Sequence, residues 1–170
     1  MKWDLRGRFN FFSNRRSFVN SNWWPSLVSI TKKIKNKELS ALEAANAYDS
    51  RIKKSKKLNT FVTETLEQAL ASAKNIDDNN LKSGVLAGAP IAVKDLFCTK
   101  NVQTTASSKI LKNFIPPYES TVTSKLWDSG AILLGKLNCD EFAMGSSNET
   151  SAYGNVINPY QESGENLVPG

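Results

Sequence analysis

Apolar residues recur at helical spacing in the first half of the chain and predict a series of amphipathic helices. The first helix is marked by apolar residues at Leu27, Val28, Ile30 and Ile34. A capping-box pattern, in which Ser40 is followed three residues later by Glu43, predicts where the second helix begins. The apolar face of a third helix is formed by Leu66, Ala69, Leu70, Ala73 and Ile76.

The hydrophobic pattern changes after residue 80. An apolar run at 86–93, with a glycine and a proline near its start, predicts a buried strand entered through a turn. A long irregular stretch at 95–119 is followed by a short predicted helix at 120–129 and a second buried strand at 131–134. A strand, a crossover helix and a second strand form a βαβ unit, which implies a parallel strand pair and an α/β architecture.

The composition limits the kinds of catalytic and metal sites that the chain can form. With 40% hydrophobic and 22% charged residues over 170 positions, the chain is expected to form one globular domain. It contains no histidine, which excludes Ser-His-Asp and Cys-His catalysis and every histidine-ligated metal site. The two cysteines, Cys98 and Cys139, are far apart, which favours free thiols in a reducing compartment. No apolar run approaches the roughly 18–20 residues of a spanning helix, so we expect no membrane association.

Residues 1–24 differ from the rest of the chain in charge and aromatic content. They hold five basic residues against one acidic residue, and seven of the sixteen aromatic residues. The composition boundary near Trp24 and Pro25 separates this extension from the domain expected at 25–170. A basic, aromatic arm suits single-stranded nucleic acid or an organellar transit segment. The third interpretation is a disordered, appended start that is not native to the fold.

Lys94 is the first candidate for chemistry because it directly follows the predicted strand. Functional groups of α/β proteins collect where strands end and loops begin. A lysine that leaves an apolar strand is expected to be partly desolvated, which disfavours the charged ammonium. A neutral amine can accept a proton from a hydroxyl nucleophile. The alternative is a surface lysine paired with Asp95.

A second candidate segment, 135–148, follows the second predicted strand. Asp140 and Glu141 would form a catalytic carboxylate pair or would be solvated acids. Cys139 would be a nucleophile or, because no histidine is present to act as its base, a small apolar filler. The Gly-Ser-Ser-Asn stretch at 145–148 offers backbone donors and hydroxyls to a polar ligand, and it would equally form a turn.

The stretch Leu86-Ala-Gly-Ala-Pro-Ile-Ala-Val-Lys94-Asp95 resembles the lysine-bearing strand of the amidase signature family. Further similar blocks follow in the same order at 97–100, 104–111, 113–118, 135–136, 140–147, 151–154 and 158–159. The resemblance covers residues 26–170. The Cys-Thr-Lys block and the Asp-Glu-Phe-Ala-Met-Gly block are most similar to one branch of this family, the A subunits of glutamine-dependent tRNA amidotransferases.

This resemblance implies a mixed central sheet covered by helices, of which the chain would form an incomplete N-terminal part. It also implies a Ser–cis-Ser–Lys triad, in which Lys94 matches the lysine. The 143–147 loop matches a segment that lines the substrate pocket, with Met144, Gly145, Ser146 and Ser147 as its residues. The family's Gly/Ser-rich signature begins after a Val-Pro-Gly such as 168–170. We therefore expect both triad serines to be missing and the chain to be inactive by itself.

The same branch implies partners and a location. Glutamine would be the ammonia donor, and amidotransferase subunits B and C would bring a misacylated tRNA, either Glu-tRNA(Gln) or Asp-tRNA(Asn). No cofactor or metal is expected on this chain, since ATP and Mg²⁺ are used by one of these partners. The expected location is the bacterial cytoplasm or the mitochondrial matrix. The alternatives are a general small-amide amidase fragment and a non-catalytic interaction or RNA-binding fragment.

Overall fold

The computed structural model describes residues 26–81 and 83–160, so the predicted extension at 1–24 and the Val-Pro-Gly at 168–170 lie outside the described residues. Helices α1 (Leu27–Lys35), α2 (Ala41–Lys54) and α3 (Leu66–Asp78) confirm the three helices predicted from apolar spacing. The predicted capping box is present, because the Ser40 hydroxyl accepts from the Glu43 amide and the Glu43 carboxylate accepts from the Ser40 amide. A short 3₁₀ turn, η1 (Lys56–Leu58), follows α2.

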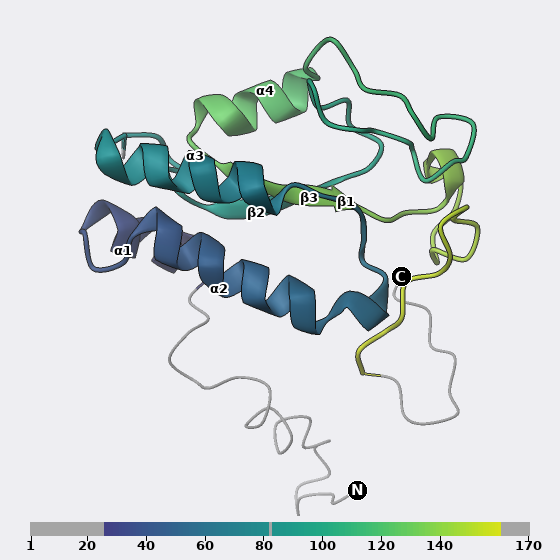
Figure 1. The fold of residues 1–170 in the computed structure, drawn as a ribbon, viewed down its shortest axis with the longest axis horizontal. Helices are drawn as coiled ribbons and strands as arrows, with labels where there is room; N and C mark the ends of the chain where they lie inside the picture. The colour runs from purple at the N-terminus through teal and green to yellow at the C-terminus, as the bar shows by residue number, and fades with distance from the viewer. Residues whose placement is uncertain (1–25, 82, 161–170) are drawn as a thin grey trace, which may run out of the picture.

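The sheet has three strands among the described residues, β1 (Phe61–Glu64), β2 (Pro90–Lys94) and β3 (Ile132–Leu137), in the order β1-β3-β2. Strand β2 runs parallel to β3, and β1 runs antiparallel to it, so the sheet is mixed. Helix α4 (Thr121–Asp128) connects β2 to β3 and confirms the predicted βαβ unit. Figure 1 shows α2 and α4 on opposite sides of the sheet.

The boundaries of the strands correct the prediction. Residues 86–89 form a turn, closed by a 2.8 Å hydrogen bond from the Ala89 amide to the Leu86 carbonyl, and the strand begins only at Pro90. Strand β3 continues past the predicted end at 134 to Leu137. Strand β1 was not predicted. Lys94 therefore ends one parallel strand, and Lys136 lies inside the other.

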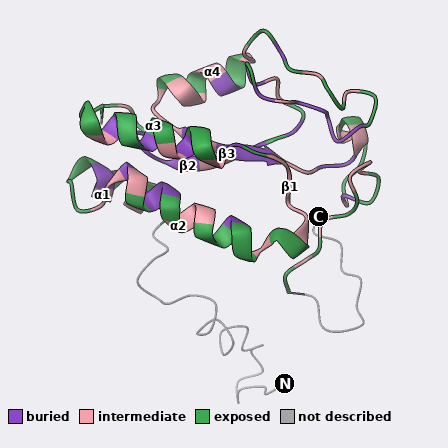
Figure 2. Ribbon diagram, viewed as in Figure 1, coloured by how far each residue is buried: buried purple, intermediate pink, exposed green. Residues whose placement is uncertain are grey.

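The main core joins the first three helices to the central strand. Its buried residues come from α1, α2, α3 and β3 and include Ile34, Ala45, Ala73, Ile132 and Leu134. Figure 2 shows this buried face running along the helices and the sheet. Gly135 permits β1 to approach β3, because a Cβ there would lie 2.4 Å from the Thr63 carbonyl oxygen.

Candidate active site

Lys94 lies at the carboxyl end of β2, opposite Leu137 of β3. Its side chain is exposed among the described residues, so the expected partial desolvation is wrong for this part of the molecule. The reason is its place at the end of β2, a strand that pairs only with β3 among the described residues. Of the predicted alternative, a surface lysine paired with Asp95, the surface position is confirmed and the ion pair is wrong. Successive residues of a strand point to opposite faces, and Asp95 pairs with Lys136 instead.

Asp95 is fully buried and connects the end of β2 to the loop that follows. Its Oδ2 accepts hydrogen bonds from the Thr105 amide at 3.1 Å, the Thr105 hydroxyl at 2.5 Å and the Ser107 amide at 3.2 Å. Its own amide donates to the Leu137 carbonyl at 2.9 Å. One side chain therefore fixes the segment 105–107 against the ends of both parallel strands.

Lys136 is the buried lysine of this region, with 0% of its surface exposed. Its Nζ donates to the Phe97 carbonyl at 2.5 Å and to the hydroxyls of Thr99 and Thr104 at 3.1 and 2.8 Å. It also lies 3.9 Å from Oδ1 of Asp95. Burial lowers the pKa of Lys136, and the negative charge of Asp95 opposes that effect. The three acceptors match the three donors of an ammonium group.

The segments around Lys94 and around 143–147 meet at Ala106. The Ala106 amide donates to the Asp95 carbonyl at 2.9 Å, and the Ala106 carbonyl accepts from the Phe142 amide at 2.8 Å. The backbone is left-handed on both sides of this contact, at Ala106 and Ser107 (φ 50° and 53°) and at Phe142 and Ala143 (φ 52° and 57°). Such conformations are costly for residues other than glycine, and they cluster at functional sites.

Asp140 is buried and organises the second candidate segment. Its carboxylate accepts from the amides of Asn148 at 2.9 Å, Glu149 at 2.9 Å and Thr150 at 3.1 Å. These hydrogen bonds, that of Asn148 foremost, lower the pKa of Asp140. The expectation of a solvated acid is therefore wrong for Asp140. Glu141 lies in η2 (Glu141–Ala143) and accepts from the Ser108 hydroxyl at 2.6 Å.

The predicted pocket loop lies at the surface of the described residues. Met144 is 84% exposed, Gly145 and Ser146 are also exposed, and Ser147 is half-buried. Gly145 packs directly against Asp140, since a Cβ at this position would lie 2.4 Å from the Asp140 carboxyl carbon. Asp140 thus holds the backbone of this loop in place. The apolar side chain of Met144 and the polar side chain of Ser146 are exposed on it.

A model of the amidase family matches residues 43–170. The chain belongs to the amidase family. It is 58% identical over 145 residues to the glutamyl-tRNA(Gln) amidotransferase A subunit of Pelagibacter ubique and 52% identical over 149 residues to the protein of the same name from Bradyrhizobium sp. strain BTAi1. These matches cover 85% of this chain but only 29% and 30% of the two relatives.

A solved structure gives the same picture of the fold. A vestigial protein complex related to the origins of an s-triazine catabolic enzyme matches with a TM-score of 0.75 and 34% identity. The match covers 81% of this chain and 31% of the solved chain. This amidase chain therefore carries one part of the fold, a mixed sheet with helices, and spans about 30% of the relatives' length.

The two cysteines, which the sequence also raised as candidates, lie in this amidase chain as packed or free side chains without a disulfide. Cys139 is buried, and its amide donates to the Ser107 hydroxyl at 3.0 Å, which fits a small packed residue. Cys98 and Cys139 are both free thiols.

Among residues 26–81 and 83–160, no group of three or more His, Cys, Asp or Glu side chains is placed to hold a metal ion. No helix in the described ranges is long and apolar enough to cross a bilayer.

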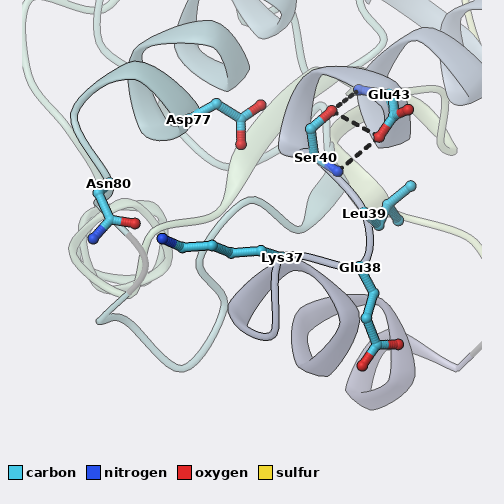
Figure 3. Close-up of a pocket in the computed structure, with 7 residues that line it drawn as sticks. All are labelled: Lys37, Glu38, Leu39, Ser40, Glu43, Asp77 and Asn80. Carbon is cyan, nitrogen blue, oxygen red and sulfur yellow. Dashed lines mark hydrogen bonds between the residues drawn. The ribbon is translucent and has the colours of Figure 1, made fainter.

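A cavity of about 800 Å³ lies away from Lys94, between the start of α2 and the end of α3. Figure 3 shows Ser40, Glu43 and Asp77 among its lining residues. The Asp77 carboxylate accepts from the amides of Ala41 at 3.0 Å and Leu42 at 2.9 Å, and Ser40 and Glu43 form the capping box. These polar groups cap the start of α2, so we assign the cavity a structural role.

Proposed function

We propose that these residues form the lysine-bearing part of the glutamine-hydrolysing A subunit of a tRNA amidotransferase. The relatives at 58% and 52% identity carry that name, and they support the assignment. The observation that carries the proposal is the position of Lys94. The Lys94 amine extends from the carboxyl end of a parallel strand. The next residue, the buried Asp95, fixes the backbone at this point. The Asp95 carbonyl is connected through Ala106 to the 142–143 segment. Ligand sites of α/β sheets lie at this end of the strands.

The proposed role of Lys94 is that of a general base. In the full-length protein, of which this chain spans about 29% by the Pelagibacter ubique relative, we expect the remainder of the fold to cover the Lys94 amine and to favour its neutral form. That amine takes a proton from a bridging serine, which in turn takes the proton of a nucleophilic serine. The nucleophilic oxygen attacks the carboxamide carbon of glutamine, and the C–N bond breaks as ammonia leaves with the returned proton. Water then hydrolyses the acyl-enzyme to glutamate. Neither serine is assigned to any of these 170 residues, so a polypeptide of these residues alone is expected to be inactive.

The 143–147 loop is proposed to line the glutamine pocket. Met144 supplies exposed apolar surface for the substrate's methylene groups, and the Ser146 and Ser147 hydroxyls supply polar contacts. Gly145 allows the loop to lie against Asp140. The released ammonia is proposed to reach a misacylated tRNA held by subunits B and C, where ATP and Mg²⁺ are used. The proposed location is the cytoplasm.

A chimeric enzyme tests the role of Lys94. Residues 26–170 replace the corresponding residues of the Pelagibacter ubique relative, whose remaining length supplies the rest of the fold. We expect this chimera to hydrolyse glutamine and Lys94→Met to lower kcat by roughly 10²-fold or more, in line with the loss of a general base. Lys74→Met, at an exposed position of α3, is the matched control and should retain activity.

Two outcomes would contradict the proposal. Full glutaminase activity in the Lys94→Met chimera would remove Lys94 from the chemistry. Faster hydrolysis of simple small amides than of glutamine by the chimera would favour the general amidase instead.

A further inference from the structure

Two oppositely charged side chains are buried together where β2 and β3 end. Asp95 and Lys136 are each 0% exposed, and neither has a place in the proposed proton transfers. On the basis of the proposed function of Lys94 as the base, we propose that the Lys136–Asp95 pair is a positioning device that fixes the end of β2 from which the Lys94 amine reaches the substrate.

The register of the sheet places the pair behind Lys94. Val93 is paired with Lys136, and Lys94 is paired with Leu137. Because side chains alternate along a strand, Val93, Asp95 and Lys136 share one face, and Lys94 belongs to the other. The pair therefore acts on Lys94 through the backbone and leaves the amine itself accessible.

Two backbone hydrogen bonds bracket Lys94. The Asp95 amide donates to the Leu137 carbonyl at 2.9 Å, and the Phe97 amide donates to the Lys94 carbonyl at 3.1 Å. Lys136 binds the carbonyl of the same Phe97 at 2.5 Å. Removing the Lys136 amine would therefore release the residue that closes the turn directly after Lys94.

The same pair holds both ends of the following loop. Lys136 binds Thr99 and Thr104, and Asp95 binds Thr105 and Ser107. The loop then contacts the Phe142 amide through Ala106. One buried pair thus sets the position of Lys94 relative to the segment that leads into the 143–147 loop.

A purely stabilising role explains this pair poorly. Burying two charges costs desolvation, and apolar side chains of similar volume often stabilise a fold equally well or better. A pair that instead fixes backbone geometry has a separate effect, because misplacing a catalytic group by about 1 Å costs roughly 10²-fold in rate.

The first experiment needs no activity. Amide hydrogen exchange is measured by NMR in the 170-residue chain for the wild type, Lys136→Met, the double variant Asp95→Asn/Lys136→Met and the control Lys74→Met. We expect exchange at the amides of residues 95 and 97 to rise by about tenfold or more in both Lys136 variants. In the double variant, which leaves no buried charge unpaired, the α2 amides should stay unchanged. The double variant removes both charges, so it provides the measurement if the single variant unfolds. In the double variant, unchanged exchange at the amides of residues 95 and 97, or an equal rise in α2, would overturn the proposal.

The second experiment separates positioning from stability in the chimera. We expect the double variant to unfold at nearly the wild-type urea concentration yet to lose roughly 10- to 100-fold in kcat with KM unchanged. Wild-type kcat in a folded double variant would overturn the positioning role. Failure of the proposed function would be seen differently, as an active Lys94→Met chimera. In that case the hydrogen-exchange experiment would still test whether the Lys136–Asp95 pair holds the end of β2.

Discussion

Replacing Asp95 with Asn removes one buried charge and keeps the shape of the side chain. The Asn oxygen can still accept from the Thr105 and Ser107 amides, but the Lys136 ammonium loses the negative charge 3.9 Å away. At an effective dielectric constant of about 20, two unit charges at that distance attract by about 4 kcal/mol. Leaving a buried charge unpaired costs roughly 3–5 kcal/mol. We therefore expect the free energy of unfolding to fall by about 4 kcal/mol at neutral pH.

The size of this loss should depend on pH. Burial lowers the pKa of Lys136 below its ordinary value of 10.5, and removing Asp95 removes the charge that opposes this effect. Between the folded pKa and 10.5, the unfolded chain binds more protons than the folded chain, so stability rises with pH. The loss of unfolding free energy caused by Asp95→Asn should therefore shrink as the pH rises toward 10.5, because a neutral Lys136 needs no counter-charge.

Urea denaturation followed by circular dichroism measures both effects, at about pH 7 and about pH 9.5. Asp78→Asn is the matched control, because Asp78 is exposed at the end of α3, and its change should stay within roughly 0.5 kcal/mol. A loss below about 1 kcal/mol for Asp95→Asn at about pH 7 would refute charge pairing as the force that holds Asp95 and Lys136 together. A deficit that grows as the pH rises would contradict the lowered pKa of Lys136.

Two further predictions concern the second candidate segment. Asp140→Asn should destabilise the chain at neutral pH. The difference from wild type should vanish as the pH falls through the lowered pKa of Asp140, because the ionised carboxylate stabilises the fold and is lost on protonation. Acid titration of both proteins, followed by circular dichroism, measures this. A difference that persists in acid would contradict it. Gly145→Ala should displace the Asp140 carboxylate and raise KM for glutamine in the chimera more than it lowers kcat, with Ala71→Gly on exposed α3 surface as the control. An unchanged KM would remove the loop from the substrate pocket.

The helices were predictable because each carries its own signal. Apolar spacing and the Ser40–Glu43 capping box depend on residues within one or two turns, and the structure keeps them. The βαβ unit was predictable for the same reason, since each strand is a compact apolar run. Strand β1 was not, because its four residues are at most half-buried and their partners in β3 lie 71 to 76 positions further along the chain.

The candidate site was predictable in position but not in environment. The place of Lys94 at a strand end follows from the apolar run before it. The burial of Lys136 and Asp95 depends on the loop 97–107, which has no hydrophobic period to indicate what it covers. A signal for Lys136 does exist: a lysine inside an apolar run that continues to Leu137 needs buried acceptors, and Asp95 shares its face by strand alternation.

Both candidate segments use the same local device. Asp95 directly follows β2, and Asp140 follows β3 by three residues; each carboxylate is buried and accepts amides from residues about ten positions further along. A carboxylate bound this way fixes the loop that it caps, and the neighbouring residue can then face outward without depending on its own contacts. Exposure of Lys94 and of Met144 is therefore compatible with a defined position for each. A buried acid next to an exposed candidate residue fixes the backbone, and the exposed side chain stays accessible.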